Sequence, residues 1–146
     1  MNTFFTLIKD QNAFQQLKFK GAFIVRIEGS CCRTSEELYN TLQSQFEFPD
    51  YFGKNLDALY DCLVDLEWIT QDRIVVLISQ FDQLLEAESA DPELLEDFLL
   101  TLNDASISWQ MNEEALRTSK SLLVYIMHSE KSEQMLADNG IDFETI

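Results

Sequence analysis

The chain has 146 residues, a length typical of one domain, and 46% of its residues are hydrophobic, so it can bury a substantial core. Ten Lys and Arg residues stand against 26 Asp and Glu residues, which gives a formal net charge of −16 at pH 7. This balance excludes the usual nucleic-acid-binding and anionic-membrane-binding proteins, because both classes rely on clustered Lys and Arg, and it favours basic partners.

The cysteines and the first residues bear on the cellular compartment. The chain has an odd number of cysteines, and their spacing is not that of metal ligands: they are Cys31, Cys32 and Cys62. Neighbouring cysteines such as the first two rarely bridge each other. We therefore expect reduced thiols in a cytoplasmic protein. The opening "MNTFFTLIKDQNAF" has neither a basic n-region nor a small-residue cleavage site, so no signal peptide is predicted. No apolar run approaches the roughly 18 residues that a membrane span needs.

Three short runs rich in β-branched residues are the strand candidates. They are "AFIVRIE" at 22–28, "RIVVLIS" at 73–79 and "SLLVYIM" at 121–127. Each run is apolar at both alternating positions, a pattern typical of strands that are buried on both faces of a parallel sheet.

Two helices are predicted between the first two strands. The first covers 35–46, where Thr34 is a candidate N-cap and Glu37 completes a capping box. The second covers 56–66, with Asn55 as its N-cap. Its inward side is a stripe of leucines at helical spacing, which are Leu56, Leu59, Leu63 and Leu66.

The second half of the chain is predicted from weaker signals. A short helix is expected over 80–87, and a longer one from Pro92 to about Trp109, with Pro at its first position. The segment "ISWQMNEEALRTSK", 107–120, is interpreted as a loop insertion. A last helical piece, "SEQMLADNG" at 132–140, ends at Asn139 and Gly140.

The order of these elements predicts the fold class. It is a small α/β domain with a three-stranded parallel sheet packed with about four helices. We expect a single domain over 1–146, with a core at about 22–129 and extensions at both ends. Residues 74–116 contain ten acidic residues and no Lys or Arg, so much of the charge imbalance lies there.

The stretch "FPDYFGKNLDALYDCL", 48–63, carries the only pattern that suggests a site. Asp57 and Asp61 are four residues apart and therefore share one helix face. A carboxylate pair can serve acid–base chemistry or bind a metal, but no His or Cys nearby completes a metal site. The chain also lacks a Gly-rich phosphate loop and the common nucleophile motifs. A hydrolase or metal enzyme that uses this pair is thus the least favoured hypothesis for its function.

Two other interpretations of the pair remain. Asp57 can simply favour the positive end of its helix while Asp61 is a solvated residue. Alternatively, the pair belongs to an interface, because Tyr51 and Phe52 lie in the loop before Gly53, where no core needs both rings. Aromatic residues beside carboxylates are typical of protein-binding hot spots.

The same stretch closely resembles the signature of the barstar family, small intracellular ribonuclease inhibitors. The shared pattern is Pro-acid-aromatic-aromatic-Gly, followed by Asn-Leu-Asp-Ala-Leu-aromatic-Asp-Cys-Leu. Weaker similarity extends through "IEGSCCRTSEELYNTL", "RIVVLISQFDQLLEA" and "SLLVYIMHS", and so covers about 22–129. The first 20 residues and the tail from about 130 lie outside the resemblance.

The resemblance implies a non-catalytic protein whose loop and helix block the active site of a basic, guanyl-specific secreted ribonuclease. Tyr51 then meets the catalytic region, and Gly53 allows close approach of the loop backbone. Asp61 is the central carboxylate, which can occupy a phosphate site through charge-assisted hydrogen bonds. The full set implied on this loop and helix is Tyr51, Gly53, Asn55, Asp57, Tyr60 and Asp61.

This sequence also departs from the family pattern. Tyr60 stands where Trp is usual, and Asp65 where the better-known inhibitor has Gly. The family's further acidic contact aligns near Leu100 or Thr101, so Asp104, one turn later, is added as a substitute contact. Two hypotheses follow: an inhibitor or immunity protein against a secreted or toxin ribonuclease, or a family module for a different toxin or regulatory partner. Neither requires a cofactor or a metal, and we expect a monomer when the protein is free.

Overall fold

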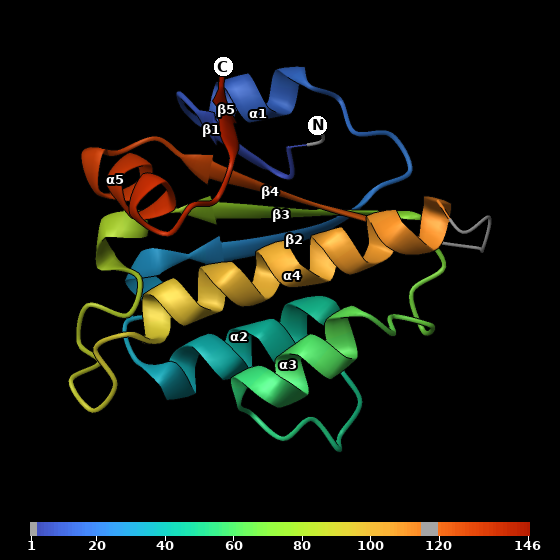
Figure 1. Ribbon diagram of the computed structural model, residues 1–146, viewed down its shortest axis with the longest axis horizontal. Coiled ribbons are helices and arrows are strands. Elements are labelled where there is room, and N and C mark those ends of the chain that lie inside the picture. The colour runs from blue at the N-terminus through green and yellow to red at the C-terminus, as the bar shows by residue number, and fades with distance from the viewer. Residues whose placement is uncertain (1–2, 115–119) are drawn as a thin grey trace.

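A parallel sheet forms the centre of the computed structural model, which describes residues 3–114 and 120–146 (Figure 1). Within these residues the sheet has five strands in the order β2-β3-β4-β1-β5, and every pairing is parallel. The strands are β1 (Phe5–Ile8), β2 (Phe23–Glu28), β3 (Arg73–Ser79), β4 (Ser121–Met127) and β5 (Phe143–Thr145).

The three predicted strands are confirmed, but the prediction of a three-stranded sheet is wrong. β2, β3 and β4 lie side by side, with Val76 in register with Val25 on one side and with Val124 on the other. β1 and β5 extend the sheet beyond β4, and both come from the ends of the chain that lie outside the barstar resemblance. These two strands have four and three residues, too few to show a periodic pattern.

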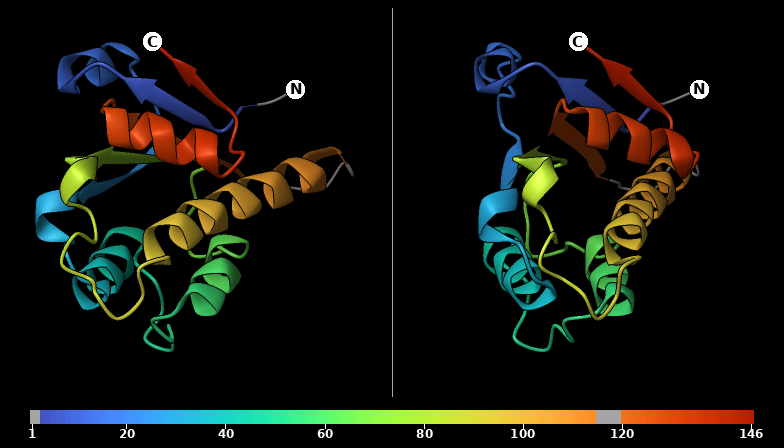
Figure 2. Two further views of the ribbon diagram at one scale, coloured as in Figure 1. Left: turned by 60° about the vertical axis from the view of Figure 1, so that its left-hand side comes forward. Right: turned by 90° about the vertical axis from the view of Figure 1, so that its left-hand side faces the viewer.

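Helices cover the two faces of the sheet unequally. The helices are α1 (Gln11–Gln16), α2 (Ser35–Phe46), α3 (Leu56–Leu63), α4 (Leu94–Glu114) and α5 (Glu130–Asp138). The main core joins one face of the sheet to residues from α2, α3, α4 and α5, whereas a small cluster around Phe14 of α1 covers part of the other face. Figure 2 shows α3 beside α4, with α3 at the side of the molecule away from both termini.

The local signals for α2 and α3 are confirmed. Thr34 and Glu37 form the predicted capping box at the start of α2. At the start of α3, the Asn55 side chain accepts a hydrogen bond from the Ala58 N–H. α3 ends at Leu63, three residues before the predicted end, and Leu66 is buried with a left-handed φ of 47° that no regular helix can contain.

The prediction of a loop at 107–120 is wrong for its first part, because α4 continues to Glu114. The helix also begins at Leu94, so Pro92 is not its first residue. A tertiary contact lies just before the extended part, since the hydroxyl of buried Ser106 donates to the Leu122 carbonyl oxygen at 2.8 Å and ties α4 to β4. Residues 115–119 of the predicted loop lie outside the described residues.

The helix predicted over 80–87 is reduced to a single 3-10 turn, Phe81–Gln83. Gln80 and Leu85, on either side of it, have positive φ values of 52° and 59°, which interrupt any longer helix. Both ends of this segment therefore turn sharply, and Phe81 is directed into the core.

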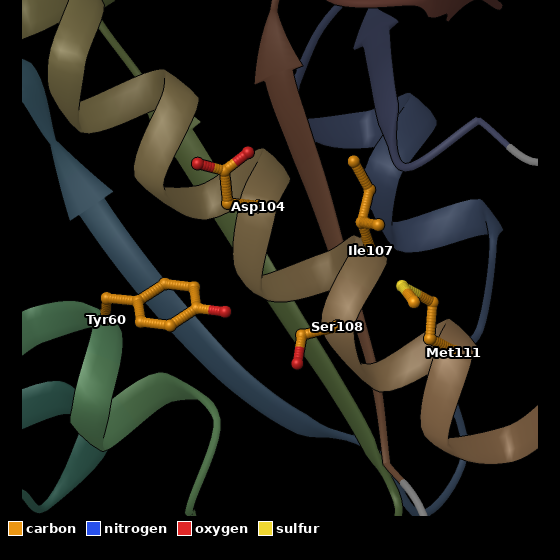
Figure 3. A pocket seen from close by; sticks show the side chains of 5 residues that line it. All are labelled: Tyr60, Asp104, Ile107, Ser108 and Met111. Carbon is orange, nitrogen blue, oxygen red and sulfur yellow. The ribbon is translucent and has the colours of Figure 1, made fainter. Parts of the chain in front are cut away.

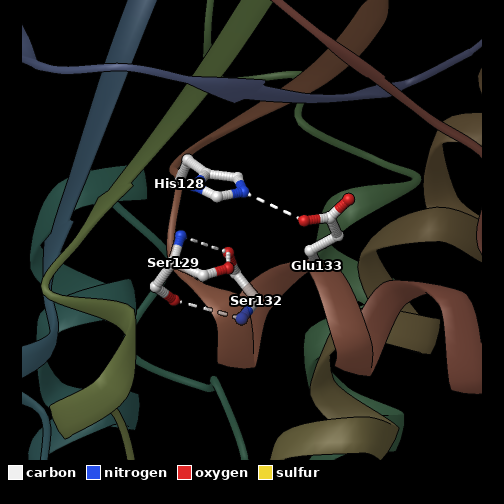
Figure 4. Close-up of polar contacts among 4 residues, drawn as sticks. All are labelled: His128, Ser129, Ser132 and Glu133. Carbon is white, nitrogen blue, oxygen red and sulfur yellow. Dashed lines mark hydrogen bonds and ion pairs between the residues drawn. The ribbon is translucent and has the colours of Figure 1, made fainter.

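The C-terminal helix α5 is present where the sequence predicted a helical piece, and Gly140 follows it with a φ of +67°. Figure 4 shows how it begins: Ser129 and Ser132 form a reciprocal capping box. A ring nitrogen of His128 lies 3.0 Å from a carboxylate oxygen of Glu133. His128 thus belongs to the local structure between β4 and α5. In the two described segments, no helix is long and apolar enough to cross a membrane.

The three thiols differ in environment, and this difference predicts their reactivity. Cys31 is exposed, whereas Cys32 and Cys62 are buried and burial raises the pKa of both thiols. Since the thiolate is the reactive form, iodoacetamide at neutral pH should modify Cys31 alone in the native protein. Mass spectrometry should show one rapid addition, then two more in denaturant. Rapid modification of Cys31→Ser protein would contradict this assignment.

Candidate partner-binding site

Buried aromatic side chains anchor the loop before α3 to the core. The Phe48 ring stacks on Phe46 at 5.0 Å and meets Phe52 at 4.8 Å between ring centroids. Phe52 is only 5% exposed, so the core takes this one of the two loop rings. Tyr51, its neighbour, is 76% exposed. The buried ring holds the loop, and the adjacent ring is presented to solvent.

Polar contacts hold the same loop against α2. The Phe52 N–H donates to the Pro49 carbonyl at 3.0 Å and closes a turn. The Lys54 ammonium donates to Oδ1 of Asn40 in α2 at 2.8 Å. Lys54 itself has a left-handed φ of 51°. Tyr51 therefore projects from a loop fixed at several points, an arrangement that reduces the entropy lost when a partner binds.

Gly53 and Asn55 shape the junction between loop and helix. Asn55 Oδ1 accepts from the Ala58 N–H at 2.8 Å, and its Nδ2 donates to the Gly53 carbonyl at 3.3 Å. Both ends of this amide are thus engaged in the free protein, and Asn55 positions the site. A Cβ atom at Gly53 would lie 3.3 Å from the Ala58 Cβ, so a side chain there would crowd the first turn of α3.

The outer face of α3 carries the two predicted carboxylates. Asp57 and Asp61 are both exposed, while Leu59 and Leu63 on the opposite side are buried. The ion pairs found within the described residues do not include either aspartate. The two charges are thus directed to solvent on one face, as their spacing predicts, and are available to a cationic group of a partner.

A groove lies between α3 and α4, and Tyr60, the residue before Asp61, lines it. It has a volume of about 440 Å³ and is lined by Tyr60, Asp104, Ile107, Ser108 and Met111. Figure 3 shows the Tyr60 ring extending from α3 toward the part of α4 that carries Asp104 and Ser108. Tyr60 and Asp104, two predicted partner contacts from different parts of the chain, therefore line one groove.

The other three lining residues were missed, because the predicted helix ended at about Trp109 and the segment 107–120 was interpreted as a loop insertion. A signal was present in the sequence: 104, 107, 108 and 111 follow the spacing i, i+3, i+4, i+7 of one helix face, with no Gly or Pro among them.

Tryptophan hydrogen bonds fix the groove walls. Buried Trp109 of α4 donates its indole N–H to the Leu63 carbonyl, the last residue of α3, at 2.7 Å. Trp68 donates to the Phe46 carbonyl at 2.9 Å and so ties the segment after α3 to the end of α2. Both tryptophans are thus packing residues. The bond from Trp109 sets the position of α3 relative to α4.

The charged residues of α3 and the turn after it, Asp57, Asp61 and Asp65, are all acidic, and Lys54 in the preceding loop is their basic neighbour. Burial raises the pKa of the Cys62 thiol on the inner face of α3, and the nearby carboxylates of Asp65 and Asp61 act in the same direction. In the part of the chain that the structure describes, no group of three or more His, Cys, Asp or Glu residues could hold a metal ion. The arrangement is suited to electrostatic contact with a basic surface.

Fold and site together define an α/β protein that presents an ordered acidic helix and an exposed aromatic loop. The family model described as "Barstar (barnase inhibitor)" matches residues 22–121. The chain therefore belongs to the barstar family. β1, α1, α5, β5 and all of β4 except Ser121 lie outside the matched range.

Two further comparisons show one protein that is similar in sequence and one that is similar in fold. A Bacillus subtilis (strain 168) protein named "Putative ribonuclease inhibitor YrdF" is 33% identical over 87 residues, which are 52% of this chain and 93% of that protein. The crystal structure of CDC6P from Pyrobaculum aerophilum matches 97% of this chain with a TM-score of 0.51 and 13% identity, and the chain spans 38% of that longer protein. This second similarity concerns the fold alone.

Proposed function

We propose that this protein inhibits a basic ribonuclease by covering its active site with an acidic docking surface, made of Tyr51, Asp57, Tyr60, Asp61 and Asp104. The observation that carries the proposal is the pair of solvent-directed carboxylates on α3 beside the exposed Tyr51 on an anchored loop. Membership of the barstar family and the inhibitor name of the B. subtilis relative support it. The proposed inhibition is by occlusion and involves no catalysis by this chain.

The chemistry of a ribonuclease explains why carboxylates suit this purpose. Such an enzyme must hold the phosphate of RNA with Arg, Lys or His side chains. A fixed carboxylate can take the place of the phosphate and accept charge-assisted hydrogen bonds from those groups. Asp61, on the exposed face of α3 one turn after Asp57, is assigned this central place. Gly53 and Asn55 act indirectly, through the shape of the junction between loop and helix.

Binding to a panel of secreted guanyl-preferring ribonucleases and toxin nuclease domains tests the proposal. We expect at least one tight complex in which RNA hydrolysis is abolished. An absence of any complex at low salt, or full RNA hydrolysis within a complex, would contradict inhibition by occlusion.

The association rate of that complex should depend strongly on salt, because the net charge of −16 attracts a basic enzyme over distance. Raising the ionic strength from about 0.01 M to about 1 M shortens the Debye length from about 30 Å to about 3 Å. Stopped-flow measurement should show the association rate falling by about 10-fold or more. The dissociation rate should change much less, and an association rate insensitive to salt would exclude steering.

One observation favours a second candidate, a barstar-family module for a different toxin or a regulatory partner. Leu100 and Thr101, where the resemblance places a further acidic contact, are half-buried, and the Thr101 hydroxyl donates to the Asp97 carbonyl of its own helix at 2.7 Å. These positions offer no charge to a partner. Recovery of a non-nuclease partner by affinity capture, together with no ribonuclease binding, would decide for this candidate.

A further inference from the structure

The groove between α3 and α4 carries apolar side chains that the core does not use. Ile107 is 39% exposed and Met111 is 62% exposed, although both are large hydrophobic residues. They lie one turn apart on α4 and line the groove together. Elsewhere in the described chain, the large exposed apolar side chains are Leu17, Tyr51 and Ile146, which stand on other elements.

The charges around the groove restrict what can fill it. Asp104 stands among the lining residues, Asp61 lies on the same helix as Tyr60, and none of the five lining residues is basic. A second copy of this chain, at −16, would be repelled by this acidic rim. A basic protein is attracted to it, and a volume of about 440 Å³ accommodates a large side chain.

We propose that the groove receives an aliphatic or aromatic side chain of the basic partner, flanked on the partner by Arg or Lys. This inference rests on the proposed function for the partner's identity as a ribonuclease. The basic residues meet Asp104 and Asp61, while the apolar side chain lies against Ile107, Met111 and the Tyr60 ring. Burial of these exposed apolar groups adds affinity that carboxylates alone do not supply. The groove then selects among basic nucleases by the side chain beside their active site.

A variant of the groove tests this with any ribonuclease that the wild-type protein binds. The double variant Ile107→Ser/Met111→Ser removes two partly exposed apolar side chains and leaves all charges in place. We expect a Kd about 10-fold higher or more, mostly through faster dissociation. Leu17→Ser is the matched control, because Leu17 is 37% exposed and lies outside the groove at the end of α1. Equal affinity of the double variant and the control would overturn the groove proposal and leave the proposed function standing.

A second measurement needs no ribonuclease. The protein is labelled with ¹³C at its methionine methyl groups and titrated with three capped peptides, Arg-Leu-Arg, Arg-Ser-Arg and Glu-Leu-Glu. We expect the Met111 signal to shift most with Arg-Leu-Arg, while the signals of half-buried Met127 and Met135 stay in place. Equal shifts with Arg-Ser-Arg, or a larger shift with Glu-Leu-Glu, would overturn the proposal. If no ribonuclease binds, the proposed function fails and this titration alone decides on the groove.

Discussion

Replacing Asp61 with Ala is expected to weaken binding to the target ribonuclease by about 2–5 kcal/mol, because a cationic group in the enzyme's phosphate site would be left without its partner. The loss should arise mainly from faster dissociation, which surface plasmon resonance can measure. Asp61 is exposed on the outer face of α3, and within the described residues no ion pair engages it. Its carboxylate is therefore directed to solvent.

Two matched variants separate the local contact from general charge. Asp142→Ala removes the same charge from an exposed residue between α5 and β5, outside the docking surface, and should leave the dissociation rate unchanged. Asp61→Asn keeps the size of the side chain without its charge, and we expect it to lose most of the affinity as well. If Asp61→Asn bound like the wild type, shape and not charge would account for the role of this residue.

The same substitution should act in the opposite direction on the free protein. Asp57 and Asp61 are like charges at i, i+4, and Ala has a higher helix propensity than Asp, so Asp61→Ala should raise the free energy of unfolding by about 0.5 kcal/mol. A residue that lowers stability in the free protein and raises affinity in a complex is typical of a binding surface. A loss of stability in Asp61→Ala would indicate a structural role that the exposed position does not suggest.

The elements that sequence patterns predicted are those determined locally. β3 and β4 were predicted with their full bounds because an unbroken apolar run, IVVLI or LLVYIM, fills most of each, and α2 because Thr34 and Glu37 define its start. β1 and β5 depend on distant partners instead: Phe5 of β1 lies in register with Val124 and with Phe143, pairings that no local pattern encodes. The part of α4 beyond 107 likewise contains a tertiary contact, the hydrogen bond from the Trp109 indole N–H to the Leu63 carbonyl.

The site also has features that local sequence determines and features that depend on tertiary packing. The shared face of Asp57 and Asp61 follows from helical periodicity, so it could be predicted from spacing alone. The burial of Phe52 could not, because it depends on Phe48 and on Tyr39, whose ring centroid in α2 lies 6.2 Å away. The groove was missed for a similar reason, since it exists only where α3 and α4 pack together.

The contrast between Phe52 and Tyr51 gives the other large expected effect. Phe52→Ala should lower the free energy of unfolding by about 3–5 kcal/mol, as deletion of a buried aromatic ring leaves a cavity. Tyr51→Ala, one residue earlier, should change it by no more than about 0.5 kcal/mol, because that ring is 76% exposed. Urea unfolding at equilibrium measures both.

The order of the two effects should be reversed for binding: the change at Tyr51 should lower affinity more than the change at Phe52. Tyr51→Ala should weaken binding by about 10-fold or more with no loss of stability, because its ring is presented to the partner and not to the core. Phe52→Leu keeps most of the buried volume and should cost less than about 1.5 kcal/mol, so it remains folded if Phe52→Ala does not. Since Phe52 only holds the loop, Phe52→Leu should bind more tightly than Tyr51→Ala.

If Phe52→Leu bound more weakly than Tyr51→Ala, the precise position of the loop would matter more than its exposed ring. The docking surface would then depend chiefly on the aromatic cluster beneath it.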